Sequence, residues 1–194
     1  MKRFYLIIFF LLFSLSAQAQ MLQAVVGAGG AGGCNPSIEY IGDKTAYTVD
    51  TLSYPDNNIF CYAFTASCSG NTKDAYLYHR GTGSESARIG LYAYSAAPPN
   101  GESLKAGTVT TAISSSTDKE WATQPLVTAV VKDTIYWMCV LGVSGAYKNY
   151  SGSGGSARYS QSILASDLPN TLPAAGWTGP TSARQVSAYI TIGP

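Results

Sequence analysis

Nucleophilic catalysis usually needs a histidine base beside the nucleophile, and this chain has a single histidine, His79. No serine lies in the Gly-x-Ser-x-Gly turn of many hydrolases, and the stretch Gly142-Val143-Ser144-Gly145 does not form one. In a predicted strand at residues 74–80, Tyr76 and Tyr78 lie on one face. His79 shares the other face with Ala75 and Leu77. This pattern favours a structural histidine, at a strand end or partly buried, over a catalytic base.

Glycoside hydrolysis would need two carboxylates held at a defined separation. Most of the 11 acidic residues fall in predicted turns, where aspartate bonds to the local backbone. Asp118 and Glu120 lie too close in sequence to flank a bond from opposite sides. A small secreted hydrolase is therefore the last of the functions that we consider.

Metal binding has no clear motif either. Glu39, Asp43 and Asp50 carry oxygen ligands that suit a structural Ca²⁺, but their spacing is not that of an EF-hand loop. A zinc site would need further histidines or a C-x-x-C pair, which the chain lacks. We expect no cofactor and no metal, with a structural Ca²⁺ as the open alternative.

The four cysteines are Cys34, Cys61, Cys68 and Cys139. An even number in an exported chain predicts two disulfides, for which three pairings exist. A bridge between Cys61 and Cys68 would require the chain to reverse between them, because an extended segment of that length is too long. The spacing does not choose among the pairings.

The N-terminus predicts export. Lys2 and Arg3 precede an apolar run from Phe4 to Leu15, and Ala17-Gln18-Ala19 matches the small-x-small pattern of signal peptidase sites. We expect cleavage after Ala19 and a secreted or cell-surface protein with no membrane span after cleavage. An uncleaved anchor is the alternative, although the run is shorter than the roughly 20 residues of a typical membrane span.

The composition also limits the partners. Only 12% of the residues are charged, and the formal net charge is +1. Loss of Lys2 and Arg3 would leave 10 basic and 11 acidic residues. A nearly neutral chain without basic clusters argues against nucleic acid as a partner.

Beyond the signal peptide (1–19) we expect two regions. Residues 20–36 form a glycine-rich, flexible lead, and residues 37–194 form one domain. Short stretches rich in β-branched and aromatic residues follow one another in this domain without helical periodicity. These predicted strands are 45–50, 59–65, 74–80, 88–94, 104–113, 126–131, 134–143 and 182–192. The pattern predicts an all-β fold, an antiparallel two-sheet β-sandwich of jelly-roll type.

Residues 144–181 contain the glycine-serine stretch 151–156 and are predicted to form a long loop, a common location for binding sites. Aromatic rings there offer stacking faces for sugars, and polar neighbours could orient a ligand. The predicted ligand-binding residues are Tyr147, Asn149, Tyr150, Arg158, Tyr159 and Trp177. Trp177 could instead pack beneath its own loop. Trp121 and Trp137 are predicted in the core. Five further tyrosines lie on predicted strands, and half of them are expected to pack on the pleated sheets: Tyr62, Tyr76, Tyr78, Tyr92 and Tyr94.

Several segments resemble a family of jelly-roll modules found in secreted bacterial and archaeal proteins and in phage structural proteins. The matching segments, which span residues 59–143, are Tyr62-Ala63-Phe64-Thr65-Ala66, Ala75-Tyr76-Leu77-Tyr78, Gly90-Leu91-Tyr92, the Pro98–Gly101 loop, Trp121–Leu126 and Thr134-Ile135-Tyr136-Trp137. The tail from Ala188 fits the closing strand. The chain departs from the pattern at Lys132-Asp133, where the family usually has glycine. The resemblance implies a non-catalytic accessory domain with an architecture similar to carbohydrate-binding modules.

We therefore expect a secreted binding or adhesion module, without enzyme activity, that recognises an extracellular glycan or another surface component. The alternative from a different class is a structural or self-assembling cell-surface protein. Low charge, tyrosine-rich strands and unpaired sheet edges would favour self-association.

Overall fold

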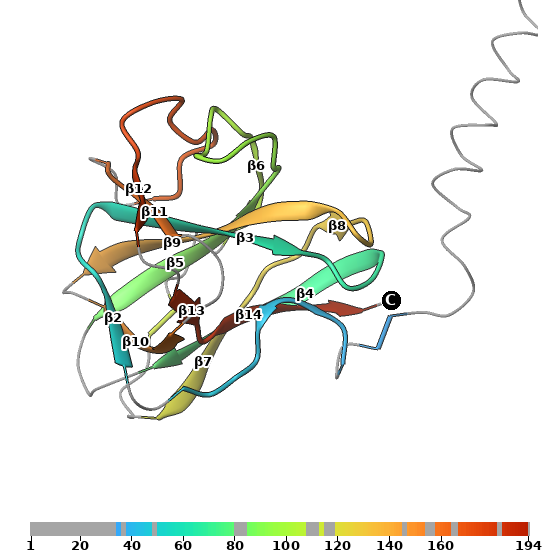
Figure 1. The fold of residues 1–194 in the computed structure, drawn as a ribbon. Helices are drawn as coiled ribbons and strands as arrows, with labels where there is room; N and C mark the ends of the chain where they lie inside the picture. Colours follow the sequence, from blue (N-terminus) through green and yellow to red (C-terminus); the bar gives the residue numbers. More distant parts are fainter. Residues whose placement is uncertain are drawn as a thin grey trace, which may run out of the picture. The chain divides into compact units, whose positions relative to one another are not determined.

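A computed structural model of the chain describes residues 34–35, 38–47, 50–79, 85–107, 113–114, 119–144, 147–153, 158–163, 167–181 and 184–193. Two antiparallel sheets pack face to face in this part of the chain, which contains no helix (Figure 1). The predicted all-β sandwich is confirmed. Within the described ranges no helix is long and apolar enough to cross a membrane. The predicted signal peptide and the glycine-rich stretch up to Gly33 lie outside the described residues.

The first sheet has eight strands. Its main path runs β1 (Tyr40–Asp43), β14 (Ala188–Gly193), β4 (Gly70–His79), β10 (Tyr147–Ser153) and β13 (Arg184–Val186). In addition, β2 (Asp50–Tyr54) pairs with β10, and both β7 (Glu120–Pro125) and β8 (Ala129–Val130) pair with β4.

The second sheet has six strands. Its order is β12 (Thr178–Thr181), β11 (Arg158–Ser162), β3 (Asn58–Thr65), β9 (Ile135–Ser144), β5 (Ser86–Tyr92) and β6 (Leu104–Gly107). Consequently β6 is an edge strand, with β5 as its one described neighbour.

The main core fills the space between the sheets and follows from the alternation of side chains along the strands. In β4, Ala75 and Leu77 are fully buried and Tyr76 points the other way. Ile89 and Leu91 of β5 contribute to the same core. The alternation predicted for residues 74–80 is confirmed.

A second core covers the outer face of the six-stranded sheet. Its buried residues are Ile59, Cys61, Tyr92, Trp137, Cys139, Leu141, Tyr159, Leu168 and Leu172. Residues 93–103 and 167–177 lie above this face in Figure 1 and bond to each other, since the Leu172 amide donates to the Glu102 carbonyl. The Tyr92 hydroxyl donates to the Pro169 carbonyl at 2.9 Å. The described residues therefore cover three of the four sheet faces with core clusters, and they form no such cluster on the outer face of the eight-stranded sheet.

Two disulfides join the four cysteines as Cys34–Cys68 and Cys61–Cys139. The predicted number is confirmed, and the structure supplies the pairing that the spacing left open. Cys61 and Cys139 lie directly opposite each other in the β3–β9 ladder. Cys61 and Cys68 are not bridged to each other, so the chain does not need to reverse between them to form a disulfide.

The prediction of a single loop over residues 144–181 is wrong, because this range contains β10, β11 and β12. The glycine and serine residues of β10 resemble a linker, but pairing with β2 and β13 keeps this segment in the sheet. The strand predicted at 45–50 is also displaced. The structure has β1 before this stretch and β2 from Asp50 onward.

Candidate functional site

Five of the six predicted ligand-binding residues lie on strands of two different sheets, and Trp177 directly precedes β12. Tyr147, Asn149 and Tyr150 lie on β10 of the eight-stranded sheet, with Tyr147 in register with Tyr54 of β2. The side chains of these three residues lie outside the described part of the structure. Arg158 and Tyr159 lie on β11 of the six-stranded sheet. The strand assignment therefore separates the predicted residues into two groups.

The second group makes packing contacts. Arg158 Nε donates to Thr181 Oγ1 at 3.2 Å, and its guanidinium lies 5.2 Å from the centre of the Phe60 ring. Tyr159 is buried and meets Trp137 edge to face at 5.8 Å. Trp177 Nε1 donates to the Pro173 carbonyl at 2.8 Å, so the indole packs on its own segment.

The outer face of the eight-stranded sheet carries a different group of aromatic residues, which we call the aromatic face. It consists of Tyr40, Tyr76, Tyr78, Trp121 and Tyr189, from strands β1, β4, β7 and β14. Tyr76 lies opposite Tyr189 in the β4–β14 ladder, and Tyr78 lies opposite Trp121 in the β4–β7 ladder. Residues directly opposite in an antiparallel pair point to the same side of the sheet, which explains how the group forms.

The rings of the aromatic face form a continuous series of contacts from one strand to the next. Tyr76 and Tyr189 are stacked with centres 4.5 Å apart, and Trp121 meets Tyr189 edge to face at 4.9 Å. Tyr78 lies 5.1 Å from Trp121, and Tyr40 lies 6.2 Å from Tyr189. Tyr78 is almost fully buried, whereas the other four side chains are partly exposed.

Among the described residues, Lys44 is the cation that lies over these rings. The Lys44 ammonium is 4.5 Å from the centre of Tyr40 and 5.2 Å from that of Tyr189. Desolvation lowers the pKa of Lys44, although the nearby Glu39 carboxylate acts in the opposite direction. Burial and the neighbouring Tyr76 raise the pKa of Tyr189, so its hydroxyl stays protonated at neutral pH.

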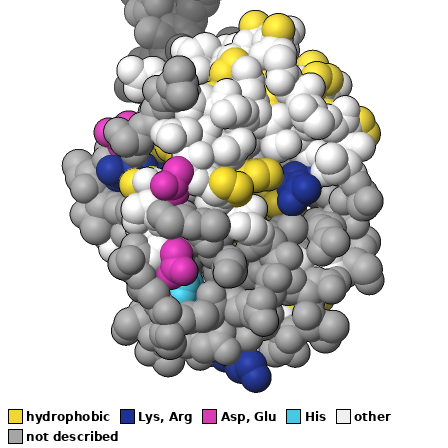
Figure 2. All heavy atoms as spheres, turned by 90° about the vertical axis from the view of Figure 1, so that its left-hand side faces the viewer, with side chains coloured by type: hydrophobic (Ala, Val, Ile, Leu, Met, Phe, Trp, Pro, Cys, Tyr) yellow, Lys and Arg dark blue, Asp and Glu magenta, His cyan; other side chains and the backbone are white. Residues whose placement is uncertain are grey.

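Partly exposed rings and phenolic hydroxyls together are suited to ligands with both apolar and hydroxylated surfaces, such as sugars. Only 12% of the residues in the chain are charged. Figure 2 shows a face of the molecule on which described Lys, Arg, Asp and Glu side chains are scattered among uncharged atoms. Neither observation favours a polyanionic ligand.

The sequence predicts only part of the aromatic face. The alternation of β4 correctly places Tyr76 and Tyr78 on one face, but it does not identify the strands on either side. The prediction that Trp121 lies in the core is wrong, because β7 pairs with β4 and places the indole on the outer face. Trp137 is fully buried, as predicted.

The structure describes some of the groups considered for catalysis or metal binding. His79 is fully buried at the end of β4, out of reach of an external substrate. In the parts of the chain that are described, no three His, Cys, Asp or Glu residues come close enough to hold a metal ion. Glu39 and Asp43, two of the residues considered for Ca²⁺, are among the described residues, whereas the side chain of Asp50 lies outside the described part of the structure.

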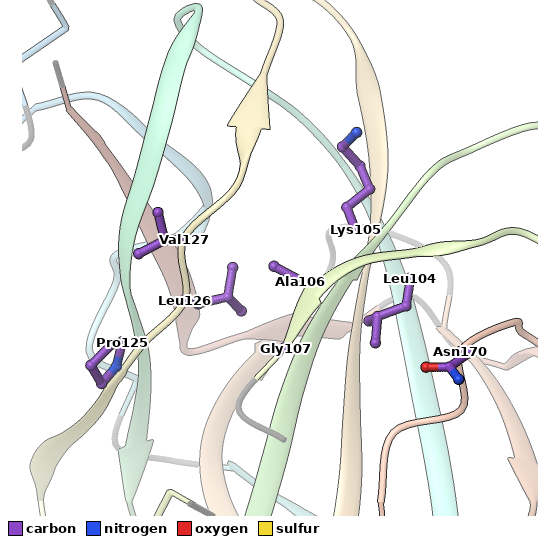
Figure 3. Close-up of a pocket in the computed structure, with 8 residues that line it drawn as sticks. All are labelled: Leu104, Lys105, Ala106, Gly107, Pro125, Leu126, Val127 and Asn170. Carbon is purple, nitrogen blue, oxygen red and sulfur yellow. The ribbon is translucent and has the colours of Figure 1, made fainter. Parts of the chain in front are cut away.

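A separate cleft of about 600 Å³ lies between β6 and the segment that joins β7 to β8. Its lining residues are Leu104, Lys105, Ala106, Gly107, Pro125, Leu126, Val127 and Asn170. Figure 3 shows the side chains of Ala106 and Leu126 facing each other across it. Lys105 is the one charged residue in this lining.

No protein-family model matches the chain, and no curated protein matches its sequence. The likeness to jelly-roll modules therefore remains a prediction from the residues quoted above.

Proposed function

We propose that this protein is a non-catalytic module that binds extracellular glycan through the aromatic face. The observation that carries the proposal is the contact series of Tyr40, Tyr189, Tyr76 and Trp121 on the outer face of the eight-stranded sheet, over which the described residues form no covering core. Sugar rings have apolar C–H faces that pack against aromatic side chains, and their hydroxyl groups pair with phenols. The resemblance to carbohydrate-binding-like jelly-roll modules supports the same function.

The proposed affinity is modest. Each aromatic contact contributes about 0.5–1.5 kcal/mol beyond the area it buries. A few such contacts, offset by the cost of association, correspond to dissociation constants in the micromolar to millimolar range.

Export to the cell exterior is part of the proposal. The N-terminal signal pattern supports it, and two disulfides are compatible with an oxidising compartment. N-terminal sequencing of the secreted protein should give Gln20 as the first residue. A product that begins at Met1 would contradict cleavage after Ala19.

The binding proposal is tested with the secreted protein on an array of immobilised plant, algal, fungal and bacterial polysaccharides. For a polysaccharide that binds, Tyr76→Ala and Trp121→Ala should each weaken binding about tenfold or more. Tyr94→Ala is a matched control, because Tyr94 packs against Trp137 on the opposite side of the molecule. Thermal unfolding of each variant separates lost contacts from lost folding.

The same array distinguishes the aromatic face from the residues that the sequence suggested on β10. The double variant Tyr147→Ala/Tyr150→Ala should bind normally if the aromatic face is the site. Loss of binding in this folded double variant, with normal binding by Trp121→Ala, would place the site on β10. Absence of binding to every polysaccharide would reject the glycan proposal.

A further inference from the structure

Exposed apolar side chains are concentrated at one edge of the sandwich. Four large apolar residues are strongly exposed in the described part of the chain: Ile38 (63%), Val127 (66%), Val131 (59%) and Ile135 (40%). Three of them fall between positions 127 and 135. Apolar clusters exposed on an otherwise soluble domain commonly mark interaction surfaces.

The same edge contains the cleft between β6 and the β7–β8 connection. Both sides of the cleft are sheet margins, because β6 ends the six-stranded order and β7 and β8 pair with β4. Leu126 in its lining is buried and belongs to the main core, and Ala106 packs against that core (Figure 3). The cleft therefore combines apolar side chains, which lead toward the interior of the sandwich, with the polar side chains of Lys105 and Asn170.

A turn next to the hollow forms a projection. Residues 131–135, between β8 and β9, are all exposed. The turn is nonetheless fixed in position, since the Val131 amide donates to the Tyr136 hydroxyl at 2.9 Å and the Lys132 amide donates to Ser69 Oγ at 2.8 Å. A projection held in this way can enter a hollow at a low cost in conformational entropy.

Charge on the two features is complementary. The turn carries Asp133 at its tip, in a left-handed backbone conformation with φ of 60°. The hollow carries Lys105, whose ammonium lies 5.9 Å from the centre of the Tyr136 ring. Lys132, the other charged residue of the turn, follows the exposed Val131 and precedes Asp133.

We propose that two copies of the chain form a dimer in which the β8–β9 turn of each copy enters the cleft of the other. A two-fold interface requires a surface that complements itself, and a hollow beside a projection meets this requirement. Val131 then covers the apolar lining of the cleft, and Asp133 approaches Lys105. Because the contact uses the edge of the sandwich, both aromatic faces stay open. This inference is independent of the glycan proposal.

Sedimentation of the full-length secreted protein over a range of concentrations tests the dimer. The wild type should be dimeric at about 100 µM, and Val131→Asp or Val127→Asp should raise the dimer dissociation constant about tenfold or more. Ile38→Asp is the matched control, since Ile38 is equally exposed but precedes β1, on the other side of β14 and β4. It should leave the dissociation constant unchanged.

A charge exchange tests the pairing of Lys105 with Asp133. Lys105→Glu and Asp133→Lys should each weaken the dimer, and the double variant should recover part of the loss. Asp133→Asn, which suits the left-handed conformation, separates loss of charge from strain in the turn. Circular dichroism should show every variant to be folded.

A monomeric wild type at the highest concentration would overturn the proposal and leave the edge to a different partner. A dimer with an unchanged dissociation constant in both valine variants would also overturn it, because the interface would then lie elsewhere.

Discussion

Trp121 of β7 and Trp137 of β9 illustrate how one residue type takes different roles. Trp137 is fully buried and contacts Tyr94 and Tyr159 at 5.1 and 5.8 Å. Trp121 is partly exposed and contacts Tyr78 and Tyr189. The surroundings of the indole, rather than its hydrophobicity, decide whether it contributes mainly to stability or to a surface.

Replacing each tryptophan by alanine should separate the two roles. Trp137→Ala should reduce the free energy of unfolding by about 3–5 kcal/mol, because it leaves a cavity in the second core. Trp121→Ala should cost about 1–2 kcal/mol, mainly through lost ring contacts. Urea unfolding of both variants measures the difference. Equal losses would mean that Trp121 is as much a core residue as Trp137.

Glu102 offers a second test at the level of single residues. Its carboxylate accepts hydrogen bonds from Ser95 Oγ at 2.7 Å and from the Asn100 amide at 2.6 Å. Burial alone would raise the pKa of Glu102, but these hydrogen bonds hold it below the usual value of 4.5. The charged form therefore stabilises the folded state above pH 4.5, and this stabilisation is lost as the pH falls through the pKa of the folded protein.

Glu102→Gln should accordingly reduce the free energy of unfolding by about 1–2 kcal/mol at neutral pH, since hydrogen bonds to a carboxylate are stronger than those to an amide. The difference from the wild type should shrink as the pH is lowered below 4.5. Urea unfolding between neutral pH and pH 3 follows this change. A difference that stays constant over the whole range would contradict the role of the charge.

At the level of strands, the sequence predicts those whose own residues alternate and fails where pairing decides. Residues 75–78 alternate between aliphatic and aromatic side chains, and β4 includes them, although it begins at Gly70, four residues before the predicted strand. The sequence of β10, Tyr-Lys-Asn-Tyr-Ser-Gly-Ser, has no such alternation and becomes a strand through its partners β2 and β13. Strand propensity depends on context in this way because it largely reflects packing on neighbouring strands.

The same reasoning applies to the candidate site. The sequence places Tyr76 and Tyr78 on a common face but does not show that β14 brings Tyr189 against Tyr76. Those two strands come from distant parts of the chain, so only the topology joins their side chains. Tyr147 and Tyr159 lie close together in the sequence and are therefore predicted in one site, but the topology assigns them to different sheets.

The two disulfides connect elements at different places in the sandwich. Cys61–Cys139 joins the central strands β3 and β9, whereas Cys34–Cys68 connects the segment before β1 to the β3–β4 turn. The bridged residues are 78 and 34 positions apart, and loops of such lengths predict stabilisation of about 2–4 kcal/mol for each bridge.

The native protein should therefore resist alkylation, and reduction before alkylation should add four alkyl groups to its intact mass. Peptide mapping without reduction should recover Cys34 linked to Cys68 and Cys61 linked to Cys139. Free thiols in the native protein, or peptides with exchanged partners, would contradict the pairing in the structure.

At the scale of the whole molecule, the surfaces of the sandwich have separate roles. The two inner faces form the main core, and the 93–103 and 167–177 segments cover the outer face of the six-stranded sheet. The aromatic face and the edge that carries Val127, Val131 and Ile135 are two separate surfaces of the described residues. The proposed glycan binding and the proposed pairing of copies therefore do not compete for one surface.

If both proposals hold, the dimer presents two aromatic faces, and binding to a long polymer should exceed binding by one face. Once the first face is bound, the second meets the same polymer at a millimolar effective concentration, which can raise the apparent affinity by about 100-fold or more. Val131→Asp should therefore weaken binding to an immobilised polysaccharide by about that factor and leave binding to its soluble trisaccharide unchanged. Trp121→Ala should weaken both, because it alters each face itself. Surface plasmon resonance with the polymer and calorimetry with the trisaccharide give the two affinities, and an equal response of Val131→Asp and the wild type to the polymer would show that the two faces act separately.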